Sequence, residues 1–94
     1  MHIEWTRTAL AGLARVVEFL EERSPTAAER AKAVMSDATR QLAQFPHSGR
    51  PSSDDPQLRE LVIPFGGYGY SLLYRVHNDR VVITNVKHQR EAGY

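Results

Sequence analysis

The last third of the chain decides its fold, and it reads Arg59-Glu-Leu-Val-Ile-Pro-Phe-Gly-Gly-Tyr-Gly-Tyr-Ser-Leu-Leu-Tyr-Arg-Val-His-Asn-Asp-Arg-Val-Val-Ile-Thr-Asn-Val-Lys-His-Gln-Arg90. Apolar residues recur here with a period of two, which is the pattern of half-buried β-strands. A Gly-rich segment and an Asn-Asp pair interrupt the pattern, and both are typical of turns. We therefore predict an antiparallel meander of three strands, at Arg59–Ile63, Tyr70–His77 and Arg80–Lys87, connected by Pro64–Gly69 and Asn78–Asp79.

The two-residue turn also predicts which residues of the last two strands face one another. One side of this ladder would carry the pairs Val76 with Val81, Tyr74 with Ile83 and Leu72 with Asn85. The other side would carry Arg75 with Val82, Leu73 with Thr84 and Ser71 with Val86. We assign the first set to the core. The other face would then present four polar or basic residues to solvent or to a partner: Arg75, Ser71, His88 and Arg90.

The preceding half of the chain has the period of helices. Apolar residues recur at helical spacing from Arg7 to Glu22, and again in an alanine-rich segment that begins at Ser24-Pro25. Thr6 is a candidate N-cap of the first helix, and proline is accommodated in the first turn of the second. The second helix should end before Phe45-Pro46, because a residue that precedes proline is pushed out of the helical region.

A short strand at His2–Trp5 precedes the helices, and a loop at His47–Pro56 leads from them to the sheet. The expected class is α+β, with a short N-terminal strand and a two-helix antiparallel hairpin packed on a small, mainly antiparallel sheet. A length of 94 residues suits a single domain, 1–94.

Composition narrows the classes of function. With 41% hydrophobic and 24% charged residues, the chain resembles an ordinary globular protein, and its net charge of +1 does not by itself predict nucleic-acid binding. It contains no cysteine and no apolar run long enough for a membrane span, so we expect a cytoplasmic protein without membrane contact. The four histidines lack metal-ligand spacing, and the Gly66–Gly69 segment lacks phosphate-loop spacing. We expect no metal and no cofactor.

The candidate functional residues gather at the end of the meander, in Lys87-His88-Gln89-Arg90. Histidine can transfer a proton near neutral pH, and an arginine beside it can stabilise the charge that develops when RNA is cleaved at a 2′-hydroxyl. A solvated strand end is the alternative interpretation. Tyr70 and Tyr74 share the parity of the core face, so we expect core aromatics with hydroxyls at the rim.

Five segments in this order resemble the RelE/ParE superfamily of bacterial toxins: Ile3-Glu4-Trp5-Thr6, Leu42-Ala43-Gln44-Phe45-Pro46-His47-Ser48-Gly49-Arg50-Pro51, Arg59-Glu60-Leu61-Val62-Ile63-Pro64, Tyr74-Arg75-Val76 and Val86-Lys87-His88-Gln89-Arg90. The resemblance implies the toxin of a type II toxin–antitoxin module, bound and held inactive by a cognate antitoxin in a hetero-oligomer. ParE-like members inhibit DNA gyrase, whereas RelE-like members are endoribonucleases that cut mRNA on the ribosome.

The departures from the RelE pattern favour the ParE branch. RelE-like toxins place lysines on the strand that here reads Leu61-Val62-Ile63, and an arginine where Gly69-Tyr70 is followed by Ser71. Phosphoryl transfer without these cations loses transition-state stabilisation. We therefore expect a gyrase inhibitor without catalytic residues, whose target-binding candidates are Arg59, Arg75, Lys87, His88 and Arg90. For the ribonuclease alternative the catalytic candidates are His88, Arg90 and Tyr94. An inactive member that only binds an antitoxin is a third possibility.

Overall fold

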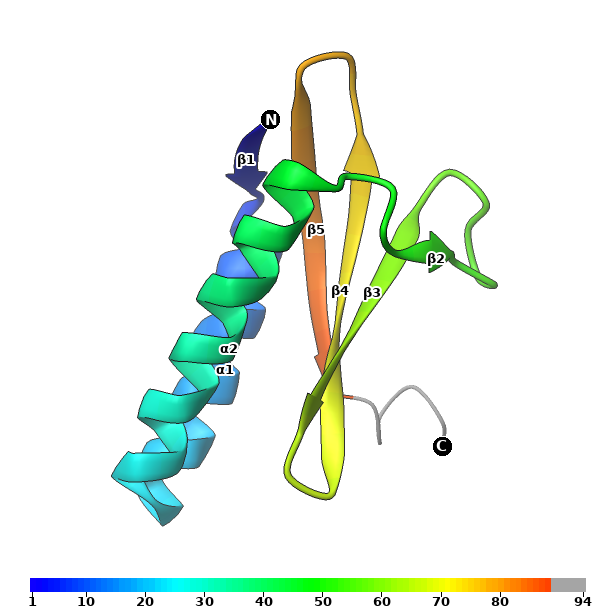
Figure 1. Ribbon diagram of the computed structural model, residues 1–94. Coiled ribbons are helices and arrows are strands. Elements are labelled where there is room, and N and C mark those ends of the chain that lie inside the picture. The colour runs from blue at the N-terminus through cyan, green and yellow to red at the C-terminus, as the bar shows by residue number, and fades with distance from the viewer. Residues whose placement is uncertain (89–94) are drawn as a thin grey trace.

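The computed structural model describes residues 1–88, so the predicted site residues Arg90 and Tyr94 lie outside the described residues. Two helices, α1 (Arg7–Arg23) and α2 (Pro25–Gln44), form an antiparallel hairpin that lies against one side of a five-stranded sheet (Figure 1). The strands are β1 (His2–Trp5), β2 (Arg50–Pro51), β3 (Arg59–Phe65), β4 (Tyr68–Val76) and β5 (Arg80–His88). The α+β class predicted from the sequence is confirmed.

Both helices begin at capping residues that the sequence indicates. The hydroxyl of Thr6 accepts a hydrogen bond of 3.1 Å from the amide of Ala9. The hydroxyl of Ser24 accepts one of 3.2 Å from Ala27, so this residue ends α1 and starts α2. Each cap satisfies an amide that has no partner inside its helix. The hairpin turn is therefore tight, as expected from Ser24-Pro25.

The strands follow the order β1-β5-β4-β3-β2 across the sheet. β1 runs parallel to β5, with His2 opposite Arg80 and Trp5 opposite Ile83, whereas the other pairs are antiparallel. β2 is a two-residue strand within the segment that we predicted as loop. The predicted Pro64–Gly69 connection is too long, because β3 and β4 continue into it and leave a turn at Gly66 and Gly67, where Gly66 has a φ of 61°.

The predicted register between β4 and β5 holds near their turn and fails further along. Val76 lies opposite Val81 and Tyr74 opposite Ile83, as expected. A β-bulge then places Thr84 outside the regular pairing. The pairs beyond it are Leu73 with Asn85, Leu72 with Val86, Ser71 with Lys87 and Tyr70 with His88, so the predicted partners of Leu72, Leu73 and Ser71 are wrong by one residue.

Burial of the side chains explains this bulge. A regular ladder would turn Asn85 and Lys87 toward the helices and Val86 away from them. Burying an unpaired ammonium costs on the order of several kcal/mol, more than the ~1 kcal/mol of a lost ladder hydrogen bond. With the bulge, Val86 is buried, the Asn85 side-chain oxygen accepts the amide of Val86 at 2.8 Å, and the Thr84 hydroxyl donates to the carbonyl of Leu73 at 3.2 Å.

The core lies between the helices and the sheet. Its fully buried large side chains include Leu42 of α2, Leu72 and Tyr74 of β4, and Val81 and Ile83 of β5. α1 lies close to β5 at Gly12, where an added Cβ would lie 3.2 Å from the carbonyl oxygen of Val86. This contact fixes the distance between α1 and the end of the sheet from which the predicted site residues project.

Candidate functional site

The face of the sheet turned away from the helices carries the first part of the candidate site. Ser71 lies between Val62 of β3 and Lys87 of β5, so the three residues form one row across the sheet. Lys87 is half-buried, and it is the only cation of this row. Arg75 lies further along β4 on the same face and is exposed, as predicted.

Ser71 is not a solvent-facing residue, contrary to the prediction. It is 1% exposed, and its hydroxyl has no hydrogen-bond partner within residues 1–88. Its strand neighbour on this face, Leu73, is also buried. The prediction rested on the alternation of side chains alone, which gives the face of a residue but not its burial.

His88 lies on the opposite face, toward α1, so the prediction that it shares a face with Arg75 and Ser71 is wrong. The bulge at Thr84 shifts the end of β5 by one residue and thereby reverses its faces. The imidazole of His88 packs edge-on against the ring of Tyr70, with centroids 5.3 Å apart and an interplanar angle of 74°. Lys87 and His88, adjacent in the sequence, therefore project from different sides of the sheet.

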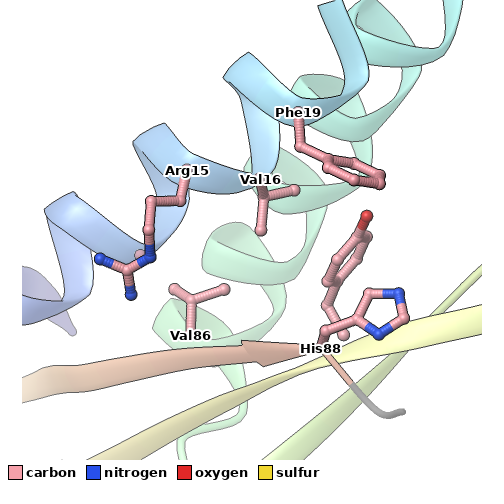
Figure 2. A pocket seen from close by; sticks show the side chains of 7 residues that line it. Arg15, Val16, Phe19, Val86 and His88 are labelled. Atoms are coloured by element: carbon pink, nitrogen blue, oxygen red, sulfur yellow. The ribbon is translucent and has the colours of Figure 1, made fainter. Parts of the chain in front are cut away.

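A cleft of about 280 Å³ opens beside His88, and we refer to it as the α1–β5 cleft. It is lined by Gly12, Val16 and Phe19 of α1 and by Tyr70, Val86 and His88 of the sheet, with Arg15 at its edge. Figure 2 shows Val16 and Phe19 projecting from the helix toward the strands, and Arg15 extending toward the sheet beside Val86. We did not predict this cleft, although Gly12, Val16 and Phe19 follow the helical spacing that places residues on one face.

Arg59, a predicted target-binding residue, holds the loop between α2 and β3. Its guanidinium donates to the carbonyl oxygen of Gly49 at 2.6 Å and to that of His47 at 3.4 Å. Next to it, Arg50 forms an ion pair with Glu60 at 3.1 Å across the β2–β3 pair. Through these contacts Arg59 has a structural role, which is to hold the loop against the sheet.

Tyr74 completes the attachment of this loop from the core side. Its side chain is fully buried, and its hydroxyl accepts a hydrogen bond of 2.9 Å from the amide of Gly49. Tyr70 and Tyr74 are core aromatics as predicted, but the hydroxyl of Tyr74 is not at the rim. Burial raises the pKa of Tyr74, and the Gly49 amide and the Arg59 charge lower it by less. Burial also raises the pKa of Tyr70.

Residues 1–88 contain no group of three or more His, Cys, Asp or Glu side chains placed to hold a metal ion. Within the same residues, neither helix is long and apolar enough to cross a bilayer.

A helix hairpin on a sheet whose first strand pairs with its last, together with the Gly49 loop and the basic end of β5, defines a toxin of the RelE/ParE superfamily. Residues 3–93 match the family model of the ParE toxin of the type II toxin–antitoxin system parDE, and the chain belongs to this family. It is thus the toxin component of a type II toxin–antitoxin module.

Relatives agree on the family but differ in the activity that their names suggest. Toxin RelE3 of Caulobacter vibrioides is 38% identical over 95% of each chain. Putative toxin Y4kP of Sinorhizobium fredii is 35% identical over 87% of this chain and 82% of its own. A solved structure described as the chromosomal ParDE toxin–antitoxin system from P. aeruginosa superposes with a TM-score of 0.78 at 25% identity, covering 94% of this chain and 95% of that one.

Proposed function

We propose that this toxin acts by binding and inhibiting DNA gyrase, as ParE-like toxins do, and that it does not cleave RNA. The observation that carries the proposal is the face on which His88 lies, because the bulge in β5 turns it toward α1 and away from Arg75 on the helix-free face. A ribonuclease of the RelE kind needs a proton-transferring group and several cations around one phosphate. Here the imidazole faces α1, and Lys87 on the other face has Ser71 as its cross-strand neighbour, with Val62 beyond Ser71 in the same row.

On this proposal the gyrase-binding surface is the helix-free face and the end of β5. Arg75 and Lys87 contribute positive charge from that face, and Arg90 stays a target-binding candidate that lies outside the described residues. His88 contributes from the cleft side of β5. Arg59 takes part by keeping the Gly49 loop against the sheet.

Cleavage of mRNA on the ribosome is the second candidate. The names of the Caulobacter vibrioides relatives favour it, since RelE1, RelE2 and RelE3 are 33 to 38% identical to this chain. Its catalytic candidates are His88, Arg90 and Tyr94, two of which lie outside the described residues.

Two assays with the purified toxin separate these candidates. The proposal expects loss of supercoiling by purified gyrase and accumulation of cleaved DNA, with mRNA intact on translating ribosomes. Codon-specific mRNA cleavage together with normal supercoiling would reject it. An absence of both effects, with no growth defect on expression, would identify an inactive member that only binds its antitoxin.

We propose that the cognate antitoxin binds along β3. β2 pairs only with Arg59 and Glu60, so within residues 1–88 the outer edge of β3 from Leu61 to Phe65 has no strand beside it. A groove of about 220 Å³ next to this edge is lined by Val34 and Ala38 of α2 and by Leu61 and Ile63 of β3, among others. An extended peptide could add a strand here and place alternate side chains in the groove.

A further inference from the structure

We propose that the α1–β5 cleft is a second contact site for the antitoxin, which receives one large apolar side chain from an acidic segment of that protein. The inference rests on the proposed function only in naming the antitoxin as the source of the segment. The cleft lies between α1 and the end of β5. The groove proposed above lies between α2 and β3, at the other side of the helix hairpin.

The size of the cleft limits its occupant. Its volume of about 280 Å³ is below the range of roughly 300–1,000 Å³ that drug-sized ligands occupy. One leucine, phenylalanine or tryptophan side chain fits this space. Gly12 lines the cleft where α1 comes close to Val86 of β5, and Phe19 forms a wall that is 53% exposed. A large apolar side chain entering from a partner would cover this exposed ring.

The wall formed by Phe19 is held in place by a neighbouring cation. The guanidinium of Arg23 lies 3.6 Å from the centre of the Phe19 ring and donates to the Phe19 carbonyl at 3.0 Å. On the sheet side, the ring of Tyr70 is fixed between two other rings. Its centroid lies 5.3 Å from that of His88 and 5.7 Å from that of Phe65. The apolar walls are therefore positioned before a partner arrives, which lowers the entropy lost on binding.

The charge of the cleft limits which residues can flank that apolar side chain in the partner. Among residues 1–88, Arg15 and His88 line the cleft and no carboxylate does so. Arg15 forms no hydrogen bond or ion pair within residues 1–88. Two other glutamates of α1 are engaged in ion pairs, Glu21 with Lys32 and Glu22 with Arg23. A segment with carboxylates beside its apolar anchor complements this edge, whereas a basic segment is repelled.

Three peptides test the inference on the full chain. The first is Gly-Asp-Glu-Trp-Glu-Asp-Gly, the second has alanine in place of tryptophan, and the third has lysine at all four acidic positions. Binding is followed through the amide resonances of Gly12, Val16 and Val86 in ¹H–¹⁵N spectra. The first peptide should shift them and saturate. The other two should bind at least ~10-fold more weakly, since one loses the apolar anchor and the other replaces attraction to Arg15 by repulsion.

Variants of the protein give the matched comparison. Phe19→Ala and Arg15→Glu should weaken binding of the first peptide by ~10-fold and ~5-fold, respectively. The controls Leu10→Ala and Arg7→Glu change an exposed leucine and an exposed arginine of the same helix outside the cleft, and should bind within ~2-fold of the unmodified chain. Equal binding of the lysine peptide, or no shift at Gly12, Val16 and Val86 with any peptide, would overturn the inference.

The gyrase assay distinguishes failure of this inference from failure of the proposed function. Peptide binding in the cleft without any effect on supercoiling would remove the proposed function and leave the cleft as an acidic-peptide site. Inhibition of gyrase without peptide binding would support the proposed function and overturn the inference about the cleft.

Discussion

The backbone amide of Gly49 donates a hydrogen bond of 2.9 Å to the buried hydroxyl of Tyr74. This bond attaches the loop between α2 and β3 to the centre of the sheet. A Cβ at Gly49 would lie 2.6 Å from that hydroxyl oxygen and 2.7 Å from the carbonyl oxygen of Glu60, which are distances that real Cβ atoms do not show. The loop therefore fits against the sheet only if this residue has no side chain.

Gly49→Ala is expected to lower the free energy of unfolding by ~2–3 kcal/mol, because neither Tyr74 in the core nor the backbone of β3 can move away easily. Urea unfolding followed by circular dichroism measures the change. The matched control is Gly67→Ala, where an added Cβ meets nothing within 4 Å, and it should change stability by less than ~0.5 kcal/mol. Equal effects of the two changes would contradict the close contact.

Tyr74→Phe should cost ~1–3 kcal/mol at neutral pH, because it leaves the Gly49 amide without its acceptor. It should also change the response to alkali. The pKa of Tyr74 is raised by burial, so the folded protein keeps this proton at a pH where the unfolded chain has lost it. Stability should therefore fall as pH rises above ~10, the pKa of an exposed tyrosine.

The alkaline loss should be smaller in Tyr74→Phe than in the unmodified chain, and smaller again when Tyr70→Phe is added, since the pKa of Tyr70 is raised as well. The raised pKa of Lys32, caused mainly by Glu29, affects all of these proteins equally. Parallel stability curves above pH ~10 for the three proteins would contradict the assignment.

Thr6→Ala should destabilise the protein more than Ser24→Ala does. Both changes remove a helix N-cap, which costs ~1 kcal/mol. Thr6 also donates to the carbonyl oxygen of Thr84 at 3.2 Å, so its removal disturbs the bulge in β5 as well. We expect a further ~0.5–1.5 kcal/mol for that bond, measured by thermal or urea unfolding, and near-complete recovery in Thr6→Ser. A larger loss from Ser24→Ala would show that the bulge contact contributes little.

His88→Ala and Arg75→Glu should differ in their effects on gyrase inhibition. His88 lies in the α1–β5 cleft against Tyr70, so its loss should change the inhibitory concentration by no more than ~3-fold, about one aromatic contact. Arg75 is exposed on the helix-free face, and reversal of its charge should cost ~10-fold or more. A loss of ~10²-fold or more in His88→Ala would instead indicate proton transfer.

Local patterns in the sequence predict the helices and the turn of the last hairpin well. Thr6 and Ser24 cap α1 and α2 as their types suggest, and Val76 pairs with Val81 across the two-residue turn. The bulge was missed, although the spacing of three between Ile83 and Val86 departs from the period of two in the rest of β5. This departure from the period of two is the feature of the sequence that indicates the bulge.

Other features depend on contacts between distant segments, for which one sequence carries little signal. The parallel pairing of β1 with β5 and the two-residue strand at Arg50–Pro51 are of this kind. Of the candidate site residues, Arg75 is exposed as expected, Arg59 is engaged with a loop, and His88 is on the unexpected face. The face of His88 depends on a single bulge, so one missed residue changes the interpretation of the whole site.

The pairing of β1 with β5 also determines when the sheet can form during protein synthesis. Thr6 bonds to a residue 78 positions later, so β1 remains unpaired after its synthesis until β5 has been made. At ~5–20 residues per second this interval is roughly 4–16 s. Until β5 has been made, Ile3 and Trp5 have no strand to pair with, so the five-stranded sheet is completed only after residues 80–88 have been synthesised.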